Sequence, residues 1–212
     1  MRRHPTLRRE DRPSDPMTRD YISDQLNRPL TLLVAWMVWK VRIMVFLHGT
    51  VIMHRSAEGR TRRERVDQVR DGKEASLADF ESYVPVENAV AKLCAWQAQG
   101  AEILYLSSHR YEVDVAKDKA ILAKHGFPPG PVYFRMKDRS YSSIIEEVVP
   151  DVFIEDDCES IGGREEMTSP FIRAEIAARI TIVVVPEFGG IDSLPNDPLE
   201  LTGQGTCGLT ED

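Results

Sequence analysis

The stretch VRIMVFLHGT, residues 41–50, decides the fold of this chain. Val41–Leu47 is an apolar run rich in β-branched and aromatic side chains, which favours a buried strand. Gly49 follows almost at once, and glycine allows the tight turn by which a chain leaves a strand. Because the run does not alternate between apolar and polar residues, we expect a sheet that is covered on both faces.

Beyond residue 50, short apolar runs alternate with amphipathic stretches. The runs that favour strands are Glu102–Leu106, Val132–Arg135, Asp151–Ile154 and Thr181–Val185. The stretches that favour helices are an exposed arginine-rich segment ending at Gly72, Pro85–Gln99, Tyr111–His125 and Ser140–Val149. Such alternation implies parallel strands with right-handed crossovers. We therefore predict an α/β fold with a single Rossmann-like parallel sheet flanked by helices, in which Val41–Leu47, Glu102–Leu106 and Asp151–Ile154 are adjacent at the centre.

The length of 212 residues suits one domain of moderate size. We expect a disordered or weakly ordered leader over residues 1–40, the domain over residues 41–200, and a flexible tail over residues 201–212. The reason is that most of the leader and the tail lack an apolar face to bury.

Composition narrows the class of protein. The net charge of -7 and the sequence pI of about 5.3 argue against binding to nucleic acid, which needs a basic face. The three cysteines fit neither a zinc site nor a disulfide framework, so we expect reduced thiols in a cytoplasmic protein. Neither half of the longest apolar stretch, Pro29–Met53, reaches the roughly 18 residues of a spanning helix, so no membrane partner is expected.

Polar residues follow the predicted strands at the edge where ligands bind in such folds. The segments that do so are His48-Gly49-Thr50, Ser107-Ser108-His109-Arg110 and Glu155-Asp156-Asp157. Lys137 lies just before the last predicted helix, Ser140–Val149. The acidic triplet is the strongest signal, because carboxylates at the end of a buried strand repel one another unless a cation or several donors face them. Hard oxygen ligands of this kind suit Mg²⁺.

Each of these segments also has a plainer interpretation. The serine pair could cap the following helix, and Lys137 could be an ordinary surface lysine. The acidic triplet could be a solvated loop, and His48 could be hydrogen-bonded beneath its own loop. Taken one at a time, the segments leave these alternatives open.

In this order, the motifs resemble those of the haloacid-dehalogenase-like (HAD-like) phosphohydrolases, across roughly residues 41–186. That family carries a strand followed by Asp-x-Asp-Gly-Thr, in which the first aspartate is the nucleophile and the second is the general acid/base. Gly49 and Thr50 match, whereas the two aspartate positions fall on Phe46 and His48. The segment between residues 51 and 84 is too short for a large cap, so the resemblance implies a minimal cap or none.

The resemblance also implies roles for the remaining residues. The residues that would bind a phosphoryl group are Gly49, Thr50, Ser107, Ser108 and Lys137. Asp156 and Asp157 would hold Mg²⁺.

Two functions stay open, because phenylalanine can neither attack phosphorus nor bind a metal. The first is a HAD-like domain that binds a small phosphorylated or otherwise anionic ligand and lacks conventional phosphatase activity. The second is a divergent Mg²⁺-dependent phosphohydrolase in which His48 acts as acid/base with the Glu155–Asp157 carboxylates. An imidazole can exchange protons near neutral pH, which makes the second function chemically reasonable.

Overall fold

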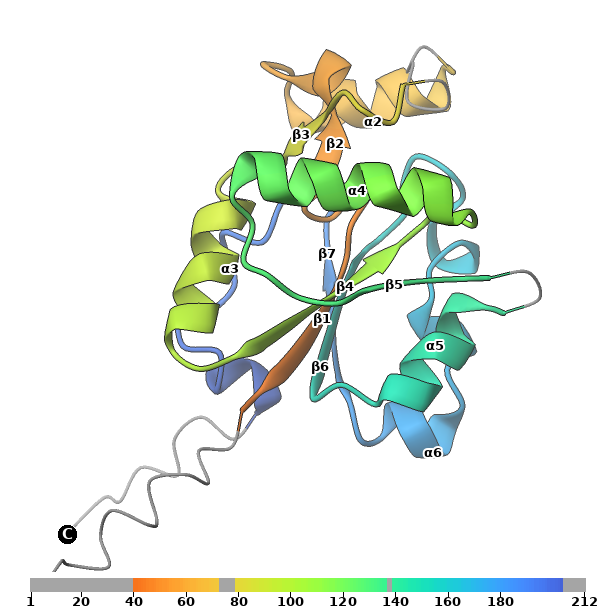
Figure 1. Cartoon of the computed structure of the whole chain (residues 1–212). Coiled ribbons are helices and arrows are strands. Elements are labelled where there is room, and N and C mark those ends of the chain that lie inside the picture. Colours follow the sequence, from red (N-terminus) through yellow and green to blue (C-terminus); the bar gives the residue numbers. More distant parts are fainter. Residues whose placement is uncertain (1–39, 73–78, 137–138, 204–212) are drawn as a thin grey trace, which may run out of the picture. The chain divides into compact units, whose positions relative to one another are not determined.

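A computed structural model of the chain describes residues 40–72, 79–136 and 139–203 (Figure 1). The leader predicted over residues 1–40 and the tail predicted over residues 201–212 lie almost entirely outside the described residues, and so does Lys137. Those three expectations therefore stay predictions.

A five-stranded parallel sheet forms the centre of the described part, in the order β5-β4-β1-β6-β7. Its strands are β1 (Arg42–Phe46), β4 (Glu102–Ser107), β5 (Val132–Phe134), β6 (Val152–Asp156) and β7 (Thr181–Val185). Met44 of β1 lies opposite Leu104 of β4 on one side and Phe153 of β6 on the other. The predicted single parallel sheet, with these three strands adjacent at its centre, is confirmed.

Helices cover both faces of the sheet (Figure 1). They are α3 (Ala89–Ala98), α4 (Glu112–His125), α5 (Tyr141–Val148) and α6 (Ala174–Ala177). Successive residues of a strand point to opposite faces. Val45 accordingly packs in the cluster of α3 and α4, whereas Met44 packs in the cluster of α5 and α6. Both faces of the central strands are therefore buried, as continuous apolar runs predict.

A small insertion separates β1 from α3. It consists of β2 (Ile52–His54), η4 (Arg55–Ala57), α2 (Arg62–Arg70) and β3 (Tyr83–Pro85). The predicted arginine-rich helix is α2, which begins with a capping box formed by Thr61 and Glu64. The antiparallel pair β2–β3 was not predicted, because strands of three residues are too short to show a period of two.

Arginine side chains of α2 fasten the insertion to the loop that follows β7. Arg62 Nε donates to the carbonyl of Glu187 at 2.9 Å, and Arg65 Nη1 donates to the carbonyl of Phe188 at 3.0 Å. The Arg65 side chain is only 9% exposed, and its Nη1 also pairs with Glu87 Oε1 at 2.9 Å. The insertion lies beyond the carboxyl ends of the strands and acts as a minimal cap (Figure 1).

The remaining elements are the short 3-10 helices η5 (Gly163–Glu165), η6 (Ser169–Phe171) and η7 (Glu200–Thr202). Among the helices in the described ranges, none combines the length and the apolar character that crossing a bilayer requires.

Candidate functional site

A cavity of about 730 Å³ lies at the carboxyl edge of the sheet. The loops after four strands contribute to its wall: His48 follows β1, Ser108 follows β4, Cys158 follows β6 and Glu187 follows β7. Val69 of α2 closes part of its mouth. The cavity therefore lies where open parallel sheets generally bind ligands.

Phe46 occupies the position at which the resemblance expects a nucleophilic aspartate. It is the last residue of β1 and lines the cavity, where its ring meets the ring of Tyr141 edge-on with 5.2 Å between centroids. The guanidinium of Arg135 lies 4.4 Å from the centre of the same Tyr141 ring, in cation–π contact. An aromatic stack thus replaces a carboxylate, and no phosphoaspartate can form at this position.

Gly49 and Thr50 support Asp156. The backbone φ of Gly49 is +83°, and a Cβ atom added there would lie 2.8 Å from Asp156 Oδ2. Only glycine suits this position, both for its conformation and for the close approach. Thr50 is fully buried and donates from Oγ1 to Asp156 Oδ2 at 2.7 Å. Of the pair that the sequence proposed for phosphate binding, Gly49 reaches the cavity wall and Thr50 does not.

The acidic cluster consists of Asp156, Asp157 and Glu187, each of which offers one carboxylate oxygen within 4.8 Å of the other two. Backbone amides hold all three side chains: the amide of Cys158 donates to Asp156 Oδ1 and that of Glu187 donates to Asp157 Oδ1, both at 3.0 Å. Ser160 donates to Glu187 from its amide and from its hydroxyl, both at 2.7 Å. The cluster is therefore positioned by the protein and contains only oxygen donors.

Burial raises the pKa of Asp156 above its ordinary value, and the charges of Asp157 and Glu155 raise it further. Burial likewise raises the pKa of Glu187, with a contribution from the charges of Asp156 and Asp157. Arg62 lies 3.5 Å from Asp157 Oδ2 but pairs more closely with Glu159, at 2.7 Å. A divalent cation would relieve this repulsion, and the donor set suits Mg²⁺.

Glu155, the first member of the predicted triplet, serves a different purpose. Its side chain accepts from the amide of Thr168 at 2.7 Å and from the amide of Ser169 at 2.9 Å, where η6 begins. It is buried and does not line the cavity. Neighbouring strand residues point to opposite faces, so Glu155 and Asp156 cannot share one site. The expectation that all three carboxylates activate water stays a prediction, although the Glu155 side chain is held at the start of η6 and lies outside the cavity lining.

The two adjacent serines also differ in whether they line the cavity. Ser107 is fully buried, and its hydroxyl donates to the carboxylate of Asp118. Ser108 lines the cavity, where its Oγ lies 2.9 Å from His48 Nδ1, and its carbonyl accepts from the hydroxyl of Tyr141 at 2.7 Å. Of the two serines proposed for phosphate binding, Ser108 is the one that a ligand in the cavity can reach.

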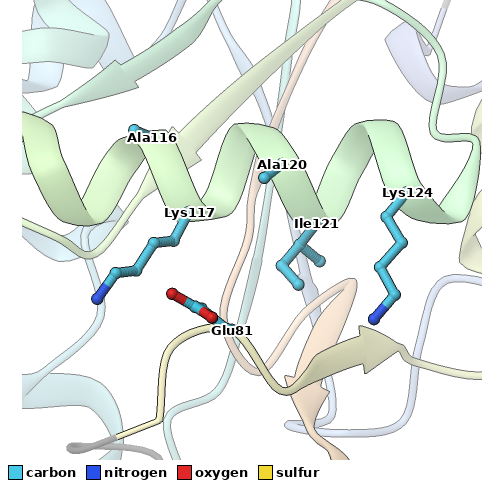
Figure 2. A pocket seen from close by; sticks show the side chains of 6 residues that line it. All are labelled: Glu81, Ala116, Lys117, Ala120, Ile121 and Lys124. Atoms are coloured by element: carbon cyan, nitrogen blue, oxygen red, sulfur yellow. The ribbon is translucent and has the colours of Figure 1, made fainter.

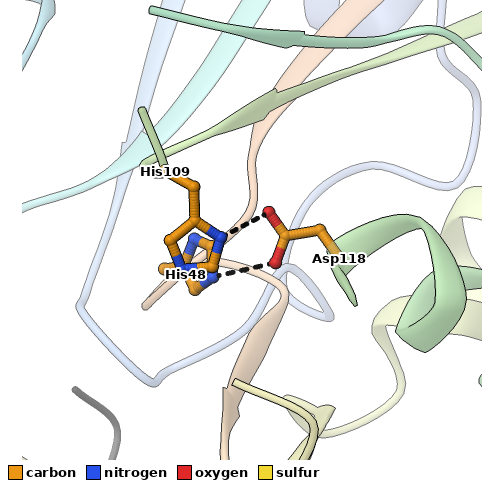
Figure 3. A group of neighbouring side chains, drawn as sticks. All are labelled: His48, His109 and Asp118. Carbon is orange, nitrogen blue, oxygen red and sulfur yellow. Dashed lines mark hydrogen bonds and ion pairs between the residues drawn. The ribbon is translucent and has the colours of Figure 1, made fainter. Parts of the chain in front are cut away.

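A histidine cluster lies beside these serines and consists of His48, His109 and Asp118 (Figure 3). The carboxylate of Asp118 faces both rings: Oδ1 is 3.3 Å from His48 Nε2, and Oδ2 is 3.1 Å from His109 Nδ1. Burial opposes ionisation of Asp118, but its interactions with His109, His48 and Ser107 outweigh burial and hold its pKa below the ordinary value. The carboxylate is therefore a buried anion between two imidazoles.

Sequence reasoning missed Asp118, Arg135 and Glu187, and it placed His109 at a strand end without giving it a role. One signal was present: Asp118 interrupts the apolar stripe of α4 between Val115 and Ile121, where a carboxylate needs a partner. Glu187 could have been found by extending the strand-end rule to β7. Arg135, which precedes Lys137 by two residues in the sequence, supplies a cation to the cavity wall.

A second hollow, of about 410 Å³, lies along α4 and the segment that leads into β3 (Figure 2). Lys117 and Lys124 reach from α4 along its wall, with Glu81 between them. Neither cluster of candidate metal ligands borders this hollow. The chemistry of the described residues is therefore concentrated in the larger cavity.

No protein-family model matches the chain, and no curated protein sequence matches it either. Solved structures with a similar fold include the class C acid phosphatase from Bacillus anthracis. The structure of that phosphatase with tungstate bound is 16% identical in sequence to this chain, with a TM-score of 0.47, and the match covers 80% of this chain and 76% of the other. A further structure of the phosphatase is 14% identical, with a TM-score of 0.45, and the match covers 89% of this chain and 88% of the other.

The Pnkp1/Rnl/Hen1 complex also contains a similar chain, with 12% identity and a TM-score of 0.45 over 71% of this chain. The match spans about half of that chain, 47% of its length. All these likenesses concern the fold alone. The resemblance to the HAD-like proteins continues to rest on the residues of the chain itself, and the observed sheet order β5-β4-β1-β6-β7 places those residues at the strand ends.

Proposed function

We propose that this HAD-like domain binds a small phosphorylated or otherwise anionic ligand in the cavity, together with Mg²⁺, and lacks conventional phosphatase activity. One observation carries the proposal: the same cavity brings hydrogen-bond donors and a cation, from Ser108, His109 and Arg135, to the acidic pair Asp156 and Glu187. A bare anion would be repelled by the acidic side. An anion accompanied by a divalent cation complements both sides.

Arg135 is the residue that most directly favours an anion. Its Nε is buried and has no hydrogen-bond partner among the described residues, although its guanidinium borders the cavity. A buried donor without a partner is costly, and a ligand oxygen would satisfy it. Arginine is also well suited to phosphate, because its planar donors match the geometry of phosphate oxygens.

Asp156 and Glu187 would hold the Mg²⁺, which would offset the charge of the carboxylates and of the ligand. Phe46 is the reason to expect binding without the family's usual reaction, since no carboxylate stands at the end of β1. The ring also fills space beside Tyr141 that a nucleophile would need.

The test is calorimetric titration of the full chain with inorganic phosphate and with p-nitrophenyl phosphate, each with and without Mg²⁺. Removing a charged hydrogen bond costs about 1.5–3 kcal/mol, so Arg135→Gln should weaken binding roughly 10- to 100-fold. Arg179→Gln is the matched control, because Arg179 is exposed at the opposite edge of the sheet, just before β7. Equal affinity in the two variants, or no binding by the wild type, would remove the support for the proposal.

A second candidate function, a divergent phosphohydrolase, is favoured by one specific arrangement. The Ser108 hydroxyl lies 2.9 Å from His48 Nδ1, and the other ring nitrogen of His48 faces the buried Asp118. A hydroxyl, a base and an orienting carboxylate in this order are the parts that nucleophilic catalysis needs. A screen of phosphate esters with and without Mg²⁺ distinguishes the two functions: turnover that is lost in His48→Gln and Asp156→Ala would favour the enzyme.

A further inference from the structure

The histidine cluster has the composition of a transition-metal site. His48 follows β1, His109 follows β4, and Asp118 lies on α4, so three separate elements bring these side chains together. Two imidazoles and one carboxylate form a ligand set that Zn²⁺ and related divalent ions prefer, whereas Mg²⁺ prefers oxygen alone. We propose that His48, His109 and Asp118 bind Zn²⁺. This site goes beyond the proposed function, which places Mg²⁺ at the acidic cluster.

The distances fit this assignment. The ligand atoms lie within 4.8 Å of one another, with 3.3 Å between His48 Nε2 and Asp118 Oδ1 and 3.1 Å between His109 Nδ1 and Asp118 Oδ2. Tetrahedral zinc with bonds of about 2.0–2.1 Å places neighbouring ligand atoms roughly 3.3 Å apart. The His48–Asp118 pair already has this spacing, whereas His109 faces the other oxygen of Asp118 and would turn toward the ion.

A second observation, independent of composition, points to a ligand at the same place. His48 Nε2 and Asp118 Oδ1 are both buried and lie 3.3 Å apart, but this contact lacks hydrogen-bond geometry and neither atom has another hydrogen-bond partner within the described part of the chain. The Asp118 side chain is 1% exposed, so water cannot readily compensate its oxygen. Leaving a buried charged oxygen without a donor is costly. A cation between the two atoms would satisfy both of them.

The residues around the cluster hold its members in orientations that suit a metal. The Ser107 hydroxyl occupies Asp118 Oδ2, which leaves Oδ1 to the ion. The Ser108 hydroxyl lies 2.9 Å from His48 Nδ1, so His48 can donate from this nitrogen and present a lone pair at Nε2. The hydroxyl of Tyr141 in turn holds the Ser108 carbonyl. Partners of this kind fix the tautomer and the ring orientation of metal-binding histidines.

The cluster also leaves one side of the ion open. His48 and His109 line the cavity, whereas Asp118 lies beneath them and does not. Three protein ligands with an open fourth position are typical of catalytic rather than structural zinc sites. The fourth position faces the cavity, where a water molecule or an oxygen of an anionic ligand would complete the tetrahedron.

The experiment uses the full chain, produced without a histidine tag, stripped with a chelator and titrated with Zn²⁺ by calorimetry. We expect one equivalent of Zn²⁺ to bind with micromolar or tighter affinity. Losing a partner of a metal ligand typically costs 10- to 100-fold in affinity, so loss of a ligand in His109→Gln or Asp118→Asn should cost at least about 100-fold. Substituting Co²⁺ should give the intense visible absorption of a four-coordinate ion, and this absorption should disappear in both variants.

His54→Gln is the matched control, because His54 is a buried histidine that lines the same cavity and lies outside the cluster. It should keep the affinity of the wild type. Circular dichroism should show that each variant is folded, and His48→Gln replaces Asp118→Asn if the latter is not. The proposal is overturned if the wild type binds no Zn²⁺, if the cluster variants bind as well as the wild type, or if the control weakens binding equally. Phosphate binding with Mg²⁺ alone is measured separately, so each proposal can fail without the other.

Discussion

The two clusters in the cavity lie close together but differ in their donors and in the way the protein holds them. Backbone amides and a serine support the acidic cluster, from the loops after β6 and β7. The histidine cluster is held by side chains, and its central carboxylate comes from the middle of a helix. The first has only oxygen donors, whereas the second has two imidazole nitrogens and one carboxylate.

Under the two proposals, this difference in donors divides the chemistry of one cavity between two ions. The oxygen cluster suits a hard cation such as Mg²⁺, and the nitrogen-rich cluster suits Zn²⁺. His48 stands where the resemblance expects the second aspartate of the first motif. An imidazole in place of a carboxylate at this one position gives the histidine cluster its nitrogen donors and leaves the acidic cluster with oxygen donors alone.

The largest effect should come from the double substitution Phe46→Asp with His48→Asp. It removes one ligand of the histidine cluster and adds carboxylates at the end of β1, so the cavity should exchange Zn²⁺ for Mg²⁺. Affinity for Zn²⁺ should fall at least about 100-fold, since a ligand is lost. Loss of the Phe46 ring should also lower the free energy of unfolding by roughly 2–5 kcal/mol.

Calorimetry with both ions and a denaturant titration measure these effects. The single substitution Phe46→Leu is the control, because it shortens the apolar side chain and adds no oxygen. If the double variant keeps the Zn²⁺ affinity of the wild type, His48 is not a ligand of Zn²⁺ and the two clusters do not divide the ions between them.

Gly49→Ala should be the next largest change, and it acts on the acidic cluster alone. Alanine is strained at a φ of +83°, and its Cβ would press on the Asp156 carboxylate. We expect the free energy of unfolding to fall by about 1–3 kcal/mol, together with weaker Mg²⁺ binding. In Gly59→Ala, where φ is +70° and no atom lies within 4 Å of the added Cβ, only the backbone strain remains. Thermal unfolding of both variants should therefore rank Gly49→Ala as the more damaging.

Glu187→Gln should weaken Mg²⁺ binding roughly tenfold, an effect of about 1.4 kcal/mol, because one charged oxygen ligand becomes neutral. The glutamine oxygen can still accept from Ser160, so the loop after β7 should keep its conformation. Affinity for Zn²⁺ should not change, since Glu187 lies outside the histidine cluster. Parallel titrations with the two ions provide the measurement, and a matching loss for Zn²⁺ would mean that the clusters are coupled.

Arg62→Gln should have the smallest effect. The ion pairs of Arg62 with Glu159 and Asp157 are more than a third exposed, and such pairs contribute only about 0–1 kcal/mol. The loss of its bond to the Glu187 carbonyl should loosen α2 more than it destabilises the fold. Hydrogen exchange of the α2 amides should therefore increase while the unfolding midpoint moves little. Arg63→Gln is the control, because the Arg63 side chain is 92% exposed and only faces its own helix neighbour Asp67.

By itself, the sequence determined the sheet and the edge at which the chemistry lies. Val41–Leu47 and Asp151–Ile154 could be identified as buried strands because an apolar run and the turn that ends it are local properties of the chain. The same reasoning found His48, Ser108 and Asp156 at strand ends, and all three line the cavity. It also showed that Phe46 stands where a nucleophile would be needed.

The tertiary structure alone decided which of those residues face one another. Glu155 and Asp156 are neighbours in sequence, yet the pleat of β6 sends one to the loop before η6 and the other to the cavity. Asp118 lies far along the chain from His48 and meets it only because α4 packs beside the carboxyl ends of β1 and β4. A local pattern carries the conformation of its own segment, whereas the meeting of distant side chains depends on strand order and helix packing. Those are properties of the folded chain as a whole.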